Sequence, residues 1–186
     1  MLRTIIAMLC LACMTLAFAT AADETLDIGP ITISLDLGSV GSYVIEKEET
    51  AIIDHRKPRF QYEISPASIK VDGIQDTVQL EVHQMSSSEP LEDAISERDQ
   101  VSGLVHCIMR SNMVPVGEDL ETKPYDIDGK EGVLATIKSD SENPMYIAAY
   151  SPDQKDGSGS IVCIVGSDFP WETTKGIFAT IRATVT

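Results

Sequence analysis

The chain has 186 residues, enough for one domain of ordinary size together with a targeting segment. It carries 14 basic and 29 acidic side chains, for a formal net charge of -15. Binding to nucleic acid and docking on anionic lipid both depend on lysine and arginine, so this charge argues against both kinds of partner. Hydrophobic residues make up 43% and charged residues 23% of the chain, which favours a folded domain over disorder.

Residues 1–21 have the three parts of a secretory signal peptide: a positive start, an apolar run and small residues at Ala19-Thr20-Ala21. Cleavage there would leave a mature chain that begins near Ala22, with residues 22–30 as a short N-terminal tail. We therefore expect a protein that is secreted or lies on the extracellular, cell-surface side of the membrane. An uncleaved N-terminal anchor is the alternative. No later stretch reaches the roughly 18 apolar residues of a membrane-spanning helix.

Strand patterns follow in the first half of the chain. The segments are Ile31 to Asp36, Ser42 to Glu46, Arg59 to Ile64 and Thr77 to His83. In the last of these, Val78, Leu80 and Val82 share one face. Glu81 and His83 lie on the other face, and we interpret His83 as an exposed strand residue.

A helix is expected from Ser88 to about Arg110, because Ser88 is a good N-cap and a basic residue suits the C-terminal end. Its apolar residues centre near Val105, so Cys107 would point about 200° away, nearly opposite the core. Cys107 and Cys163 are the two cysteines outside the signal, and an exported protein with two cysteines suggests a disulfide. The expected orientation of Cys107 disfavours that bond, so a disulfide and two free thiols both stay open.

The second half shows four short strands separated by turn-forming residues such as Asp128-Gly129. They are Lys123 to Ile127, Gly132 to Lys138, Met145 to Tyr150 and Ser160 to Gly166. Ile161 to Val165 is apolar throughout, which is typical of a central strand covered on both faces.

A C-terminal helix is expected to pack on the sheet through one stripe of residues, namely Trp171, Thr174, Phe178, Ile181 and Val185. Two helices and a continuously apolar strand together predict an α+β fold. We expect an antiparallel sheet with helices packed on its faces, an α/β/α sandwich, in a single domain over residues 31–186.

This order of elements resembles the PsbP-like fold family. The likeness rests on the strand from Thr77 to His83 leading into Ser88-Glu89-Pro90-Leu91, the hairpin at 125–132 and the closing helix with Thr180-Ile181. The hairpin and closing helix, with Phe169-Pro170-Trp171, also resemble uncharacterised secreted proteins of methanogenic archaea. The resemblance covers residues 31–183 and implies a PsbP-like sandwich. Members of that family are commonly exported, and they have varied binding roles and mostly no catalysis.

Acidic residues are the candidates for a site. Asp126 and Asp128, followed by Gly129, are similar to the start of a calcium loop, although the third acid and the final bidentate Glu are missing. A hairpin turn explains the same residues. Asp153 and Asp156 bracket a second loop that would bind calcium weakly. No spacing of His, Ser or Cys matches a catalytic motif, and no cofactor other than calcium is expected.

The sequence therefore predicts an exported, non-catalytic binding or accessory domain with a protein or small-molecule partner. The alternative is a calcium-dependent or hydrolytic extracellular enzyme with an unfamiliar site. That alternative requires the four acids Asp126, Asp128, Asp153 and Asp156 to cluster in space.

Overall fold

The computed structural model describes residues 23–186 with gaps at 39, 57–58, 88–96, 139–142 and 154–160. The expected signal peptide and its cleavage near Ala22 lie outside the described residues.

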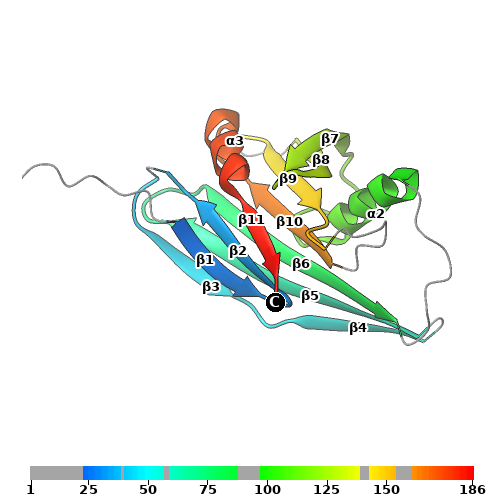
Figure 1. Ribbon diagram of the computed structural model, residues 1–186. Helices are drawn as coiled ribbons and strands as arrows, with labels where there is room; N and C mark the ends of the chain where they lie inside the picture. Colours follow the sequence, from blue (N-terminus) through cyan, green and yellow to red (C-terminus); the bar gives the residue numbers. More distant parts are fainter. Residues whose placement is uncertain (1–22, 39, 57–58, 88–96, 139–142, 154–160) are drawn as a thin grey trace, which may run out of the picture.

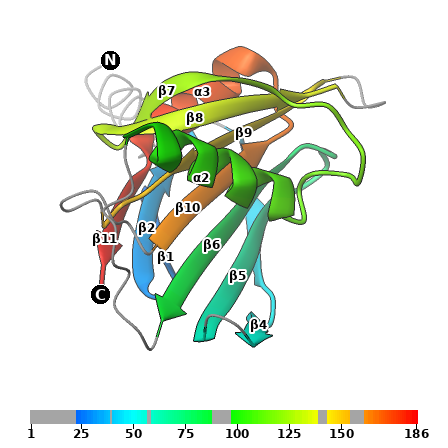
Figure 2. The same ribbon diagram turned by 90° about the vertical axis from the view of Figure 1, so that its right-hand side faces the viewer.

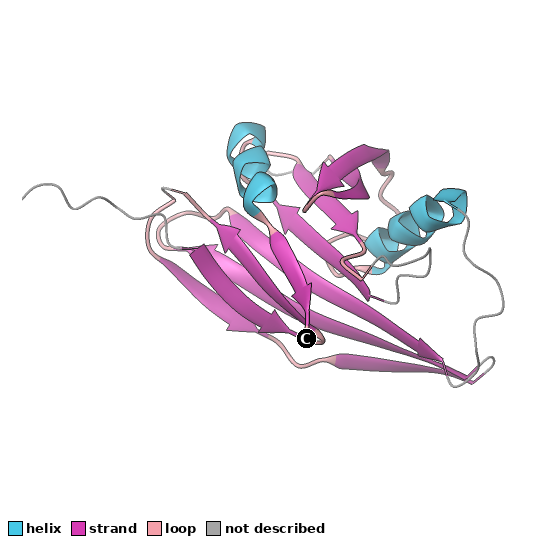
Figure 3. Ribbon diagram, viewed as in Figure 1, coloured by secondary structure: helices cyan, strands magenta, loops and turns pink. Residues whose placement is uncertain are grey.

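Strands dominate the described part of the chain, as Figure 3 shows. A three-stranded antiparallel sheet has the order β1-β2-β11, from β1 (Asp23–Ile28), β2 (Ile31–Asp36) and β11 (Arg182–Val185). An eight-stranded antiparallel sheet has the order β3-β5-β6-β10-β9-β8-β7, and β4 pairs with β5. Its strands are β3 (Tyr43–Lys47), β4 (Ala51–Arg56), β5 (Arg59–Val71), β6 (Thr77–Ser87), β7 (Glu121–Ile127), β8 (Lys130–Ile137), β9 (Met145–Tyr150) and β10 (Ile161–Ser167).

The large sheet is covered differently on its two faces (Figures 1 and 2). The helix α2 (Glu97–Arg110) packs against β8, β9 and β10 on one face. The small sheet and the helix α3 (Trp171–Thr180) cover the other face. In Figure 2, α2 crosses in front of the sheet and leaves the lower parts of β5 and β6 uncovered.

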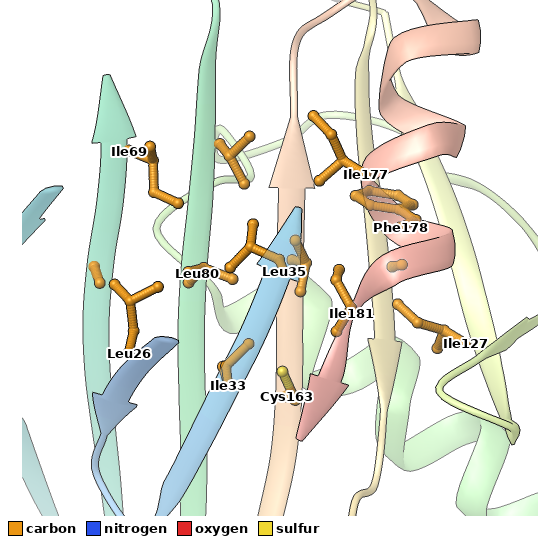
Figure 4. Packing of buried hydrophobic residues seen from close by; sticks show 14 of the residues in the cluster. Leu26, Ile33, Leu35, Ile69, Leu80, Ile127, Cys163, Ile177, Phe178 and Ile181 are labelled. Carbon is orange, nitrogen blue, oxygen red and sulfur yellow. The ribbon is translucent and has the colours of Figure 1, made fainter. Parts of the chain in front are cut away.

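Alternation along the central strands explains both cores. On β6, Val78, Leu80 and Val82 share one face, as predicted, and that face points into the cluster beneath the small sheet, where Figure 4 shows Leu80 beside residues of both sheets. On β10, Cys163 enters that cluster while Ile164 enters the cluster under α2. The expected central strand covered on both faces is confirmed, because β10 lies between β6 and β9 and its apolar residues fill two cores.

The predicted α/β/α sandwich is wrong. The described chain is mostly β, and a second sheet takes most of the place expected for a helical layer. The second sheet forms because apolar residues alternate along the N-terminal end of the chain. Leu26 and Ile28 on β1 and Ile33 on β2 all point at the large sheet and are buried. Three short strands that pair with one another satisfy their backbone while burying this row.

Both ends of the chain differ from the sequence prediction. Residues 22–30 were expected to form a tail, but Asp23–Ile28 pair with β2 through a turn at Gly29-Pro30. Gly29 has φ +55°, a left-handed conformation that favours glycine. The C-terminal helix ends at Thr180, because the chain extends at Ile181 and β11 then pairs with β2. The stripe expected to include Val185 is therefore interrupted.

The helix α2 is turned relative to the prediction. Leu104 and Ile108 are its buried residues, whereas Val101 and Met109 are 50% and 61% exposed. The prediction counted every apolar residue of the helix as buried and therefore placed the core-facing side wrongly, because single apolar side chains are common on protein surfaces. Cys107 is consequently half-buried at the flank of the core face rather than opposite it. The N-terminal part of the expected helix, residues 88–96, lies outside the described residues.

Cys107 and Cys163 are free thiols. Cys163 packs in the core beneath the small sheet, whereas Cys107, on α2, packs against the core on the opposite face of the large sheet. The large sheet therefore separates the two thiols.

Phe178 tests the packing of α3, because its ring is 1% exposed and contacts Tyr125 edge to face with centroids 6.3 Å apart. Phe178→Ala should lower the free energy of unfolding by about 3–5 kcal/mol, from lost burial and the cavity left behind. Val185→Ala is the control, since Val185 is 45% exposed on β11 and its loss should cost less than about 0.5 kcal/mol. Urea unfolding measures both, and equal losses would contradict the structure.

Candidate functional site

A buried polar cluster lies on the face of β6 that α2 approaches. Glu81 is 2% exposed and His83 is 1% exposed, and proteins almost never bury a glutamate completely unless it is paired. Side chains two apart on a strand share a face, and here His83 Nε2 lies 2.8 Å from Glu81 Oε2. The earlier interpretation of His83 as an exposed residue is wrong, because the end of α2 and the segment after it cover this part of β6.

Tyr62 and Cys107 extend this cluster. Tyr62 comes from β5, and its Oη lies 2.5 Å from His83 Nδ1. The same hydroxyl donates to Cys107 Sγ of α2 at 3.7 Å. The arrangement is a continuous chain of contacts, from a buried carboxylate through an imidazole and a phenol to a half-buried thiol.

Charge and burial act in opposite directions on His83. Burial lowers the pKa of His83, but its interactions with the neighbouring Cys107 and with the Glu81 carboxylate raise it by more, and the net shift is upward. Burial and the neighbouring Cys107 raise the pKa of Tyr62, against the opposing effect of Arg110, whose guanidinium lies 5.9 Å from the Tyr62 ring centroid. His83 is thus stabilised in its protonated form, and Tyr62 stays a neutral hydroxyl.

A pocket of about 210 Å³ opens beside Glu81, between the C-terminal half of β5, the N-terminal half of β6 and the segment after α2. Glu81 Oε1 accepts a hydrogen bond from the backbone N–H of Asn112 at 2.9 Å, which holds the segment after α2 against β6. The lining residues are Glu48, Pro66, Ala67, Ser68, Lys70, Thr77, Gln79, Leu80, Glu81, Asn112 and Met113.

Pro66 marks the point where the edge neighbour of β5 changes from β4 to β3. It lies in β5 opposite Glu81 of β6, between the segment of β5 that pairs with β4 and the segment that pairs with β3. Proline has no N–H for a ladder, so it is tolerated where one neighbouring strand gives way to the next. Its carbonyl accepts the N–H of Glu48 at 3.2 Å, which brings that residue to the rim of the pocket.

The predicted calcium residues occupy other places. Asp128 forms the β7–β8 turn with φ 55°, and its Oδ2 accepts the N–H of Ala183 at 2.9 Å. Asp126 is exposed on β7. Asp153 Oδ1 accepts the hydroxyl of Ser151 at 3.0 Å in the loop after β9.

Asp156, the fourth predicted calcium residue, lies outside the described residues. Within the described ranges, no three His, Cys, Asp or Glu side chains are placed to hold a metal ion. Asp128 instead joins the hairpin to β11.

Sequence reasoning missed the cluster for an identifiable reason. The alternation on β6 placed Glu81 and His83 on one face correctly, but nothing local indicated that this face was covered. Tyr62 and Cys107 are 21 and 24 residues from His83 in the chain, so only the strand pairing and the docking of α2 bring the three together. The one hint in the sequence was that the strand with Glu81 and His83 is followed by a helix, which could fold back over their face.

Comparisons with protein-family models, curated protein sequences and solved structures returned no match for this chain. The family resemblance inferred from the sequence stays a prediction. Neither helix in the described part of the chain combines the length and apolar run that crossing a membrane requires.

Asp128→Ala should lower the free energy of unfolding by about 2–4 kcal/mol. The variant loses the hydrogen bond to Ala183 and places a residue with a Cβ and no polar side chain at positive φ. Asp128→Asn keeps an acceptor and tolerates that φ, so it should lose less than half as much. As a control, unfolding is measured with calcium and with EDTA. A loss of unfolding free energy that appears only with calcium would indicate that Asp128 binds calcium.

The raised pKa of His83 predicts how stability depends on pH. A histidine whose pKa is higher in the folded state adds stability below its unfolded value of about 6.5. That stability is lost as the pH rises through the folded value. NMR titration of the His83 ring should give a midpoint above 6.5, and Glu81→Gln should lower that midpoint by removing the carboxylate. A wild-type midpoint below about 6.5 would show that desolvation dominates.

Proposed function

We propose that this chain is a non-catalytic binding or accessory domain that acts outside the cytoplasm and takes a small polar ligand in the pocket beside Glu81. The export part of the proposal is supported by the signal pattern in residues 1–21. The binding part is supported by one observation: a concave site in which a buried, hydrogen-bonded carboxylate meets several polar side chains.

The surroundings of His83 favour binding over acid–base catalysis in this pocket. Both ring nitrogens are engaged, Nδ1 with Tyr62 and Nε2 with Glu81. The ring is 1% exposed and is not part of the pocket lining. His83 therefore holds the Glu81 carboxylate in place from outside the pocket. It cannot act there as a catalytic base, because such a base must reach the proton that it takes.

The lining suggests which ligand class fits. Glu48 and Glu81 both line the pocket, while Lys70 Nζ lies 2.5 Å from Glu46. A cationic amine would meet the two acids, and Ser68, Gln79 and Asn112 offer neutral hydrogen-bonding groups. The volume is below the usual range for drug-sized ligands, so the ligand should be about the size of an amino acid.

Thermal denaturation with a panel of small amines, amino acids and neutral sugars tests this proposal. A ligand at a hundred times its Kd adds about 2.7 kcal/mol of stability, so binding should raise the melting temperature measurably. Amines and amino acids should raise it, and neutral sugars should not.

Ser68→Tyr fills the pocket with a ring and should abolish the shift. Ser34→Tyr is the matched control, because Ser34 is also a half-buried strand serine but lies on β2 in the small sheet. Absence of a shift with every compound, or equal shifts in the two variants, would overturn the proposal.

A further inference from the structure

The outer end of the polar cluster has no part in the pocket. Cys107 is half-buried on α2, whereas its partners Tyr62 and His83 are 7% and 1% exposed. A hydrogen-bonded row of buried groups thus ends at a thiol that solvent reaches. Buried polar groups joined in this way are costly to keep unless every member is satisfied.

The contacts allow two arrangements of protons. With a neutral imidazole, Tyr62 O–H donates to His83 Nδ1, and Cys107 keeps its proton. With a protonated imidazole, both ring nitrogens donate, Nε2 to Glu81 and Nδ1 to the oxygen of Tyr62. Tyr62 O–H then donates to Cys107 Sγ, which is the direction of the 3.7 Å contact. Moving between them carries the Cys107 proton to His83 through Tyr62.

Charged groups around the cluster favour the second arrangement. Glu81 on β6 faces the protonated ring, and Arg110 on α2 lies over Tyr62. The strands β8, β9 and β10 contribute buried apolar side chains to the core under α2, for example Val133, Ile147 and Ile164. No described acid other than Glu81 bonds to the row, so one carboxylate balances the imidazolium.

We propose that Cys107 is a reactive thiol that passes its proton through Tyr62 to His83 and is modified by low-molecular-weight disulfides. The sulfur of Cys107, as thiolate, attacks one sulfur of the disulfide and forms a new S–S bond. The old S–S bond breaks, and the leaving thiolate takes a proton from water, because the His83 ring is 1% exposed and both of its nitrogens are engaged. Cys107 is oxidised to a mixed disulfide, and half of the reagent is reduced to its thiol. Tyr62 and His83 are positioning residues in this reaction.

The test uses the full chain with two neutral reagents, iodoacetamide and 2-hydroxyethyl disulfide, so that the net charge of -15 does not bias the rates. Mass spectrometry of tryptic peptides follows Cys107 in residues 99–110 and Cys163 in residues 156–175. At pH 7, Tyr62→Phe and His83→Gln should each slow modification of Cys107 by about tenfold or more. Near pH 9.5 the rates should converge, because ordinary thiols ionise at about 8.5 without help.

Tyr43→Phe is the matched control. It also removes a tyrosine hydrogen bond, to Glu24 near the small sheet, and should leave the rate at Cys107 unchanged. Rates are compared at a temperature where Cys163, which is 0% exposed, stays unmodified in every variant. Equal rates for wild type and Tyr62→Phe at pH 7 would overturn the proposal, as would an unreactive Cys107 in the wild type. A slowing that persists near pH 9.5 would do so too, since it would indicate altered access rather than proton transfer.

Discussion

Strand β6 lies inside the molecule, and its two faces carry different side chains. Val78, Leu80 and Val82 meet the small sheet and α3, where burial is favourable without further conditions. Glu81 and His83 meet the end of α2, where a buried charged group without a partner would cost several kcal/mol. They therefore bond to each other, and the arrangement of Tyr62 and the backbone around them follows from that requirement.

Glu81 links the two sites of the molecule. One of its oxygens bonds to His83, and the other accepts the N–H of Asn112 in the wall of the pocket. The pocket and the row that ends at Cys107 therefore share a carboxylate, while the residues that distinguish them, Ser68 and Tyr62, lie apart on β5. Variants at those two positions separate binding in the pocket from chemistry at the thiol.

The covering of the large sheet explains where these sites lie. The helix α2 packs on β8, β9 and β10, and its C-terminal end reaches β5 through Cys107 and Tyr62. Among the described residues, no helix covers the lower parts of β5 and β6 in Figure 2, and the pocket forms at the opposite ends of these two strands, beside the segment after α2. A helix long enough to cover β5 completely would have buried Lys70 and Glu46, which instead pair at 2.5 Å on an exposed surface.

Local pattern alone determined much of this protein. Alternation placed β2 over Ile31–Asp36, put Glu81 and His83 on one face of β6, and identified the Asp128-Gly129 hairpin. Such patterns are readable because the side-chain period of a strand is two, whatever lies above it. The charge of -15 is likewise a property of the sequence.

Only the tertiary structure decided what covers each face. The N-terminal segment looked like a tail because only Leu26 and Ile28 mark its buried face, and the hairpin that it forms with β2 is stable only when it packs on the large sheet. His83 looked exposed for the same reason, since burial depends on α2 docking over it. The meeting of Tyr62, His83 and Cys107 requires contacts among three separate elements, and a period along one strand carries no information about them.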